Sequence, residues 1–193
     1  MLRWGATDEE LDQPFPGADL IPEGQRTGTM AVTIDAPPSG VWPWLVQMGC
    51  DRAGWYSLDW LDNGGVPSAE EIHPEWQQLE VGDRIASTPS GSFWFEVAAV
   101  EPQRFLALRA PIDITGRPFD TNGARPPAYV DVVWCFLLED LKGGRTRLVV
   151  SQYESARPWL FHAVGKFLFW EPAHWVMQRR QFDNLKRRAE STQ

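Results

Sequence analysis

The amino-acid sequence predicts an α+β fold in which a curved antiparallel sheet wraps round a long C-terminal helix. Apolar residues recur at three- and four-residue steps from residue 171 onward, which is the spacing of one helix face. Between residues 83 and 154, short segments of alternating apolar and polar residues are separated by turns, a pattern typical of antiparallel strands. Two or three small helices are expected after the first strand. A run of strands followed by a covering helix favours this fold class.

Size and composition suit a single domain with one hydrophobic core. The chain has 193 residues, of which 43% are hydrophobic and 23% charged, and both values are ordinary for a globular protein. The formal net charge of −8 argues against a nucleic-acid partner, because phosphates require a basic surface. Eleven tryptophans supply large rings with one hydrogen-bond donor each, which suits either a core or an aromatic-lined pocket.

The cysteine and histidine positions predict no metal site and no cofactor. Cys50 and Cys135 are far apart and match no metal or redox spacing. Cys135 lies in an apolar run, so a buried free thiol is expected there. The three histidines show no ligand spacing, and the glycine pair at 143–144 marks a hairpin turn rather than a phosphate loop. The N-terminus is acidic and lacks the apolar segment of a signal peptide, so we expect a cytoplasmic location.

The first 27 residues read as an extended N-terminal arm, and residues 28–193 as a single domain. The arm is rich in proline, glycine and acidic residues, with one helical turn expected at residues 7–11. Its acidic side chains suggest that it lies on the basic end of the last helix.

Short elements follow in order along the chain. Residues 28–36 alternate as a first strand. A short helix is expected from Pro37 to Gly49, because prolines suit a helix start and glycine a helix end. A second helix is expected over residues 55–62, and a third turn from Ser68, a favourable N-cap residue.

Five further strands form the predicted sheet, at residues 83–87, 92–101, 104–110, 129–138 and 145–154. The last two make a hairpin that turns at residues 142–144. In the fourth of these strands, Trp134 shares one face with the other even-numbered residues, and Cys135 lies on the opposite face. We expect one face of the sheet to be polar. The proline-rich segment 111–128 between the hairpins is expected to be an irregular loop that acts as a lid or excursion.

The C-terminal region reads as two helical pieces hinged at Pro172. From Glu171 onward the predicted inner face consists of Trp175, Gln178, Phe182, Leu185 and Ala189. Residues 158–170 are apolar over nearly the whole helical circumference. Such a segment is buried in the domain, forms a homodimer contact, or lies in a membrane surface. It is too short to span a bilayer, so no transmembrane segment is expected.

Seven segments together resemble the START-like superfamily, also called SRPBCC, which includes the birch-pollen-allergen type and the polyketide cyclases. They are RWGAT at 3–7, VTIDAPP at 32–38, VWPWLVQMG at 41–49, GWYSLDWLDN at 54–63, VGDRI at 81–85, TRLVV at 146–150 and KRRAE at 186–190. The resemblance spans nearly the whole chain and lies nearest a bacterial branch whose members mostly have no assigned activity. Segment 111–128 does not fit the family pattern, and the strand end at 151–154 is less basic than the pattern predicts. The resemblance implies a helix-grip fold that encloses an apolar cavity, but it implies no reaction.

Several polar residues are candidates for chemistry, each with a structural alternative. Glu171 and His174 are three residues apart and can share one helix edge, either as an acid–base pair or as a capping acid beside a satisfied histidine. Tyr56 and Asp59 would present a phenol and a carboxylate at a cavity mouth, or else belong to a small helix anchored by Trp60. Glu96 is a cavity carboxylate only if Trp94 points inward, and we prefer the arrangement with Phe93, Phe95 and Val97 inward.

We therefore expect a protein that binds a small lipophilic or aromatic molecule in an apolar cavity between sheet and C-terminal helix. The predicted ligand-binding residues are Tyr56, Trp60, Trp134, Tyr153, Phe167, Trp175 and Phe182. One alternative is a cyclase or aromatase acting on a polyketide-like substrate, with Tyr56, Glu171 and His174 as candidate catalytic residues. Another is an interaction module that uses the apolar 158–170 helix.

Overall fold

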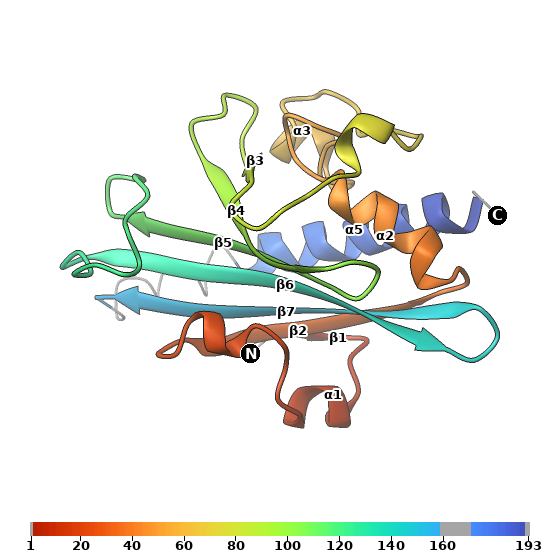
Figure 1. The fold of residues 1–193 in the computed structure, drawn as a ribbon, viewed down its shortest axis with the longest axis horizontal. Helices are drawn as coiled ribbons and strands as arrows, with labels where there is room; N and C mark the ends of the chain where they lie inside the picture. Colours follow the sequence, from red (N-terminus) through yellow and green to blue (C-terminus); the bar gives the residue numbers. More distant parts are fainter. Residues whose placement is uncertain (1, 159–170, 192–193) are drawn as a thin grey trace.

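The computed structural model describes residues 2–158 and 171–191, and their core is a seven-stranded sheet (Figure 1). The strand order is β1-β2-β7-β6-β5-β4-β3, and every neighbouring pair is antiparallel except β1, which runs parallel to β2. The strands are β1 (Leu2–Trp4), β2 (Gln25–Ile34), β3 (Arg84–Ala86), β4 (Trp94–Glu101), β5 (Phe105–Asp113), β6 (Tyr129–Leu141) and β7 (Arg145–Arg157).

Helices lie on both sides of this sheet (Figure 1). The described α-helices are α1 (Asp8–Asp12), α2 (Pro38–Val46), α3 (Asp59–Asp62) and α5 (Glu171–Ser191), with 3₁₀ turns at Ala18–Leu20 and Pro74–Trp76. Figure 1 shows α2, α3 and α5 on one side of the sheet and α1 on the other. The predicted α+β arrangement of a sheet gripping a C-terminal helix is confirmed.

The main core lies between the sheet and the pair α2 and α5. Of the predicted inner face of α5, Gln178, Phe182, Leu185 and Ala189 are buried, as the helical spacing predicts, and Trp175 packs at the edge. On the sheet, Phe136 and the other even-numbered core residues of β6 face this helix. Arg188, which lies outside the predicted inner face of α5, is also buried.

The opposite face of the sheet carries a second hydrophobic core, which corrects the expectation of a polar face. Phe15 and Ile21 from the N-terminal segment pack there against Val133, Cys135 and Val149. The buried free thiol predicted at Cys135 is confirmed, and burial raises its pKa to about 12. The N-terminal segment therefore supplies the cover that this face of the sheet requires.

Two arginines attach the N-terminal segment to the sheet. Arg26 donates to the backbone oxygens of Leu11 (2.7 Å) and Gln13 (2.8 Å). Arg147 forms a bidentate ion pair with Glu10, at 2.7 and 2.9 Å. The acidic segment thus pairs with the sheet and not with the basic end of α5, which lies on the other face (Figure 1). The expected helical turn is present as α1, capped by Thr7. The division into an arm and a domain at residue 27 stays a prediction.

The small helices differ from those expected. Only residues 59–62 of the predicted second helix are helical, because Tyr56 has a positive φ of 56° that ends any helix there. No helix begins at Ser68; the next turn is Pro74–Trp76. Trp60, expected as the anchor of this helix, is 72% exposed, and its neighbour Leu61 is 51% exposed.

The segment 111–128 is more regular than expected. β5 continues to Asp113, and Ile112 pairs with Pro118 across a short turn. The Asp113 carboxylate accepts hydrogen bonds from Thr115 and Arg117 inside this turn. Residues 159–170, which make up nearly all of the predicted apolar helix, lie outside the described residues, whereas Pro172, the predicted hinge, lies in the first turn of α5. Within the described part, no helix is both long and apolar enough to cross a membrane.

Candidate functional site

An aromatic cluster built round Trp134 lies where α5 begins to cover the sheet. The Trp134 ring centroid is 5.7 Å from Trp55, 6.1 Å from Phe95, 4.7 Å from Phe136 and 6.0 Å from His174. We call these five residues the Trp134 cluster. Trp134 and Phe95 are half-buried, whereas Trp55 and Phe136 are buried. The cluster therefore presents ring edges at the margin of an otherwise closed core.

A chain of buried amides supports this cluster from α5. Trp134 Nε1 donates to Gln178 Oε1 (3.2 Å), and Gln178 Nε2 donates to Gln181 Oε1 (2.8 Å). Gln181 Nε2 in turn donates to the Trp55 carbonyl oxygen (2.9 Å). Both glutamines are at most 2% exposed, so their hydrogen bonds are needed to offset burial. The feature of the sequence that indicates this hydrogen-bonded series is Gln178, a glutamine at a core-facing helical position.

Between the sheet and α5, the described side chains line a cavity of about 10 Å³. It is lined by Gly28, Met30, Val150, Gln152, His174 and Gln178. That space holds roughly one water molecule. The ligand cavity implied by the resemblance is therefore not open in this structure and stays a prediction.

Three of the predicted ligand-binding residues share the α5 side of the sheet. Besides Trp134, Phe182 is fully buried and stacks on Trp4, with 5.9 Å between ring centroids. Trp175 is half-buried beneath the Arg179 guanidinium, at 4.6 Å. Phe167 lies outside the described residues.

Tyr56 is held in the core instead of at a cavity mouth. Its side chain is fully buried, its phenol oxygen accepts a hydrogen bond from Gln47 Nε2 (2.8 Å), and Arg188 lies over the ring at 4.8 Å. Burial raises the pKa of the phenol. Trp60, by contrast, projects from α3 into solvent. Asp59 accepts hydrogen bonds from the Ser68 hydroxyl and amide, so it is not simply solvated.

The other candidates are dispersed over the fold. Tyr153 lies on the opposite face of the sheet, where its phenol oxygen accepts from Arg26 Nε at 2.9 Å. Glu96 is exposed, and Phe95 and Val97 point to the main core, as preferred from the sequence. His174 faces Trp134, but the Glu171 side chain lies outside the described part, so their pairing stays a prediction. In the described residues, no three His, Cys, Asp or Glu side chains are grouped to hold a metal ion.

Asp62 is a half-buried acid that the sequence did not single out. Both of its carboxylate oxygens are buried, close to the Ser57 hydroxyl and to backbone amides. Burial, with a smaller contribution from the nearby Asp59 charge, raises the pKa of Asp62 to about 6. The adjacent Ser57 hydroxyl donates to the Met177 carbonyl oxygen on α5 (3.1 Å).

Replacing Asp62 with asparagine should therefore change stability in a pH-dependent way. The folded-state pKa of about 6 lies above the ordinary aspartate value of 3.8, so the wild-type protein loses stability as pH rises from about 4 to above 6. Asp62→Asn should be more stable than wild type at pH 7.5 by about 1 kcal/mol, after allowing for partial solvent screening. Urea unfolding at pH 4 and pH 7.5 measures this. A difference between the proteins that is the same at both pH values would contradict the assignment.

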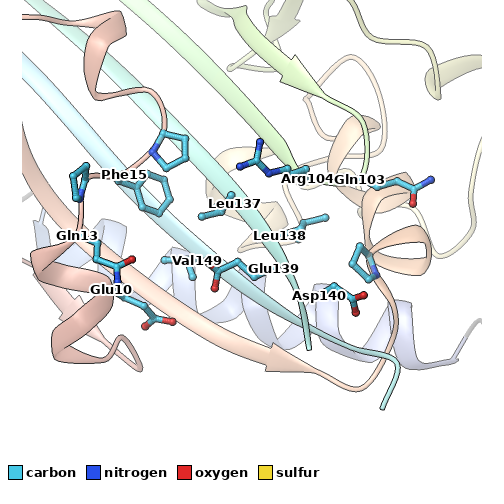
Figure 2. A pocket seen from close by; sticks show the side chains of 13 residues that line it. Glu10, Gln13, Phe15, Gln103, Arg104, Leu137, Leu138, Glu139, Asp140 and Val149 are labelled. Carbon is cyan, nitrogen blue, oxygen red and sulfur yellow. The ribbon is translucent and has the colours of Figure 1, made fainter. Parts of the chain in front are cut away.

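A second hollow lies on the opposite face of the sheet, beside the N-terminal segment. It has a volume of about 470 Å³ and is partly open to solvent. Figure 2 shows Glu10, Phe15, Arg104, Leu137, Glu139 and Val149 around it. This hollow was not predicted from the sequence. The available signal was Phe15, a lone aromatic residue between two prolines in a polar segment.

Comparisons with protein-family models and with curated proteins give no match, whereas solved structures do match. A hypothetical protein from Helicobacter pylori is 18% identical with a TM-score of 0.52, and the match covers 83% of this chain and 86% of that one. DynU16 of the dynemicin biosynthetic locus is 17% identical over 86% of this chain and 47% of that one, with a TM-score of 0.44. Ara h 8.0201 is 13% identical over 87% and 99%, with a TM-score of 0.45.

Likeness at such low identity shows the fold alone. The sheet order, the antiparallel pairing of β2 to β7 and the position of α5 against the sheet agree with it. The chain has the helix-grip fold that the sequence resemblance predicts.

Proposed function

We propose that the protein binds a small apolar or aromatic molecule between the sheet and α5, against the Trp134 cluster. The observation that carries this proposal is the pair of half-buried rings, Trp134 and Phe95, at the margin of a core that is otherwise closed. Burial of apolar area would supply the affinity, and aromatic stacking would orient a flat ligand. The Trp134–Gln178 hydrogen bond places a polar pair at the same point.

Binding requires side chains to move, because about 10 Å³ cannot hold such a ligand. Trp134 and Phe95 have less packing to lose than Trp55 and Phe136, since part of each is already exposed. A ligand that packs on these two rings would bury ring surface that now faces solvent, and this burial favours binding. The cyclase alternative has less support, because the phenol of Tyr56 is committed to Gln47 in the core.

Titration with the neutral apolar dye N-phenyl-1-naphthylamine tests the proposal. We expect saturable binding to the wild-type protein and at least tenfold weaker binding to Trp134→Ala, because a stacked aromatic contact is lost. Trp94→Ala is the matched control. Trp94 is also a half-buried strand tryptophan, but it lies beneath Arg84 and away from the cluster. Failure of the wild-type protein to bind, or equal loss in both variants, would contradict the proposal.

A further inference from the structure

The hollow on the opposite face of the sheet, which we call the N-terminal groove, is a built feature. Its floor is formed by Phe15, Leu137 and Val149, which are at most 9% exposed. One end is closed by Gln103 and Arg104 from the turn between β4 and β5 (Figure 2). A volume of about 470 Å³ falls within the range of small-molecule sites.

The wall of the groove is held in place by the two arginines already described. Arg26 binds the backbone of Leu11 and Gln13, and its guanidinium lies over the Phe15 ring at 5.6 Å. Arg147 fixes Glu10 through two hydrogen bonds. The groove is therefore largely formed before any ligand binds, which lowers the entropic cost of binding.

The charge at the groove is negative. Glu10, Glu139 and Asp140 line it, and the guanidinium of Arg147 is already engaged by Glu10. Arg104 lines it too, but it is paired with Glu101 outside the groove. Among the described residues, the side-chain carboxylate of neither Glu139 nor Asp140 has a hydrogen bond or ion pair, and both residues are exposed. Two carboxylates beside an apolar floor thus lack a positive partner.

We propose that the N-terminal groove binds a small amphipathic organic cation. Its apolar or aromatic body would lie on Phe15, Leu137 and Val149, and its ammonium or guanidinium group would pair with Glu139 and Asp140. A cation with an apolar body satisfies both the floor and the rim, whereas an anion would meet uncompensated negative charge. This site is independent of the Trp134 cluster, because the two lie on opposite faces of the sheet.

Calorimetric titration with 1-naphthylmethylamine and with its neutral analogue 1-naphthalenemethanol tests this site. In low salt we expect the amine to bind at least fivefold more tightly than the alcohol, and 1 M NaCl should remove most of that preference. The double variant Glu139→Gln/Asp140→Asn should bind both compounds alike. Asp183→Asn is the control, because Asp183 is an exposed acid on α5, and it should keep the wild-type preference.

Equal binding of the amine and the alcohol by the wild-type protein would overturn the proposal. So would no detectable binding of the amine, or an unchanged preference in the double variant. The substituted carboxylates are exposed and unpaired in the described structure, so unfolding is not expected to obscure the result.

Discussion

Replacement of Arg188 by alanine is expected to lower the free energy of unfolding by about 2–4 kcal/mol. The Arg188 side chain is 4% exposed and donates to the carbonyl oxygens of Ala69 (2.8 Å), Ser68 (3.4 Å) and Asn184 (3.3 Å). It also lies over the buried Tyr56 ring. The variant would leave these carbonyls without a charged donor and open a space beside the ring, so α5 would lose one of its attachments to residues 56–70.

Arg187→Ala is the matched control for this prediction. Arg187 precedes Arg188 and pairs with the same acid, Glu70, but its side chain is 55% exposed. We expect its loss to cost less than about 1 kcal/mol, because exposed ion pairs contribute little. Urea unfolding of both variants provides the comparison. Similar losses for the two would show that charge pairing with Glu70, rather than the buried hydrogen bonds, is what Arg188 contributes.

Phe182→Ala should destabilise the protein by about 3–5 kcal/mol. Phe182 has no exposed surface, and its ring stacks on Trp4 of β1. The cavity left behind would also free β1, which is paired in the sheet only with β2. Amide hydrogen exchange should therefore accelerate at residues 3 and 4 more than in β6, alongside the drop in the free energy of unfolding.

Val176→Ala on the same helix serves as the comparison for Phe182. Val176 is 48% exposed, so its truncation should change the free energy of unfolding by no more than about 0.5 kcal/mol. If the two variants lost similar stability, α5 would not be packed on the sheet through the Phe182 face.

Local periodicity accounts for the parts of the fold that could be predicted from the sequence. The three- and four-residue spacing identified the α5 face that contains Phe182, and strand alternation placed Trp134 and Cys135 on opposite faces. Both patterns depend only on neighbours along the chain. The same alternation, with the hairpin register that pairs Trp134 with Gln152, would also have placed Tyr153 away from the α5 side.

The second core could not be predicted because it depends on contacts between distant parts of the chain. Arg147 binds Glu10, and Arg26 binds Tyr153, across more than a hundred residues. The segment that makes these contacts is polar and rich in proline and glycine, so it has no periodicity to read. The left-handed backbone at Tyr56 could not be predicted from the sequence either, because tyrosine rarely adopts a positive φ.

Only part of the candidate site could be predicted, because local periodicity shows which face a residue lies on but not how the assembled core is packed. Alternation and helical spacing brought Trp134, Trp175 and Phe182 to one face. They could not show that other side chains fill the space between sheet and α5, since close packing is a property of the assembled core. Nor could they place Trp60, whose short helix turns it outward into solvent.

The most direct test of the proposed function follows the indole N–H signals of ¹⁵N-labelled protein during titration with N-phenyl-1-naphthylamine. Binding against the Trp134 cluster predicts that the Trp134 and Trp55 indole signals shift, because both rings lie in the cluster. The Trp94 and Trp60 signals should stay in place, since Trp94 lies beneath Arg84 and Trp60 projects into solvent. A titration that leaves the Trp134 signal unchanged while other signals shift would contradict the account.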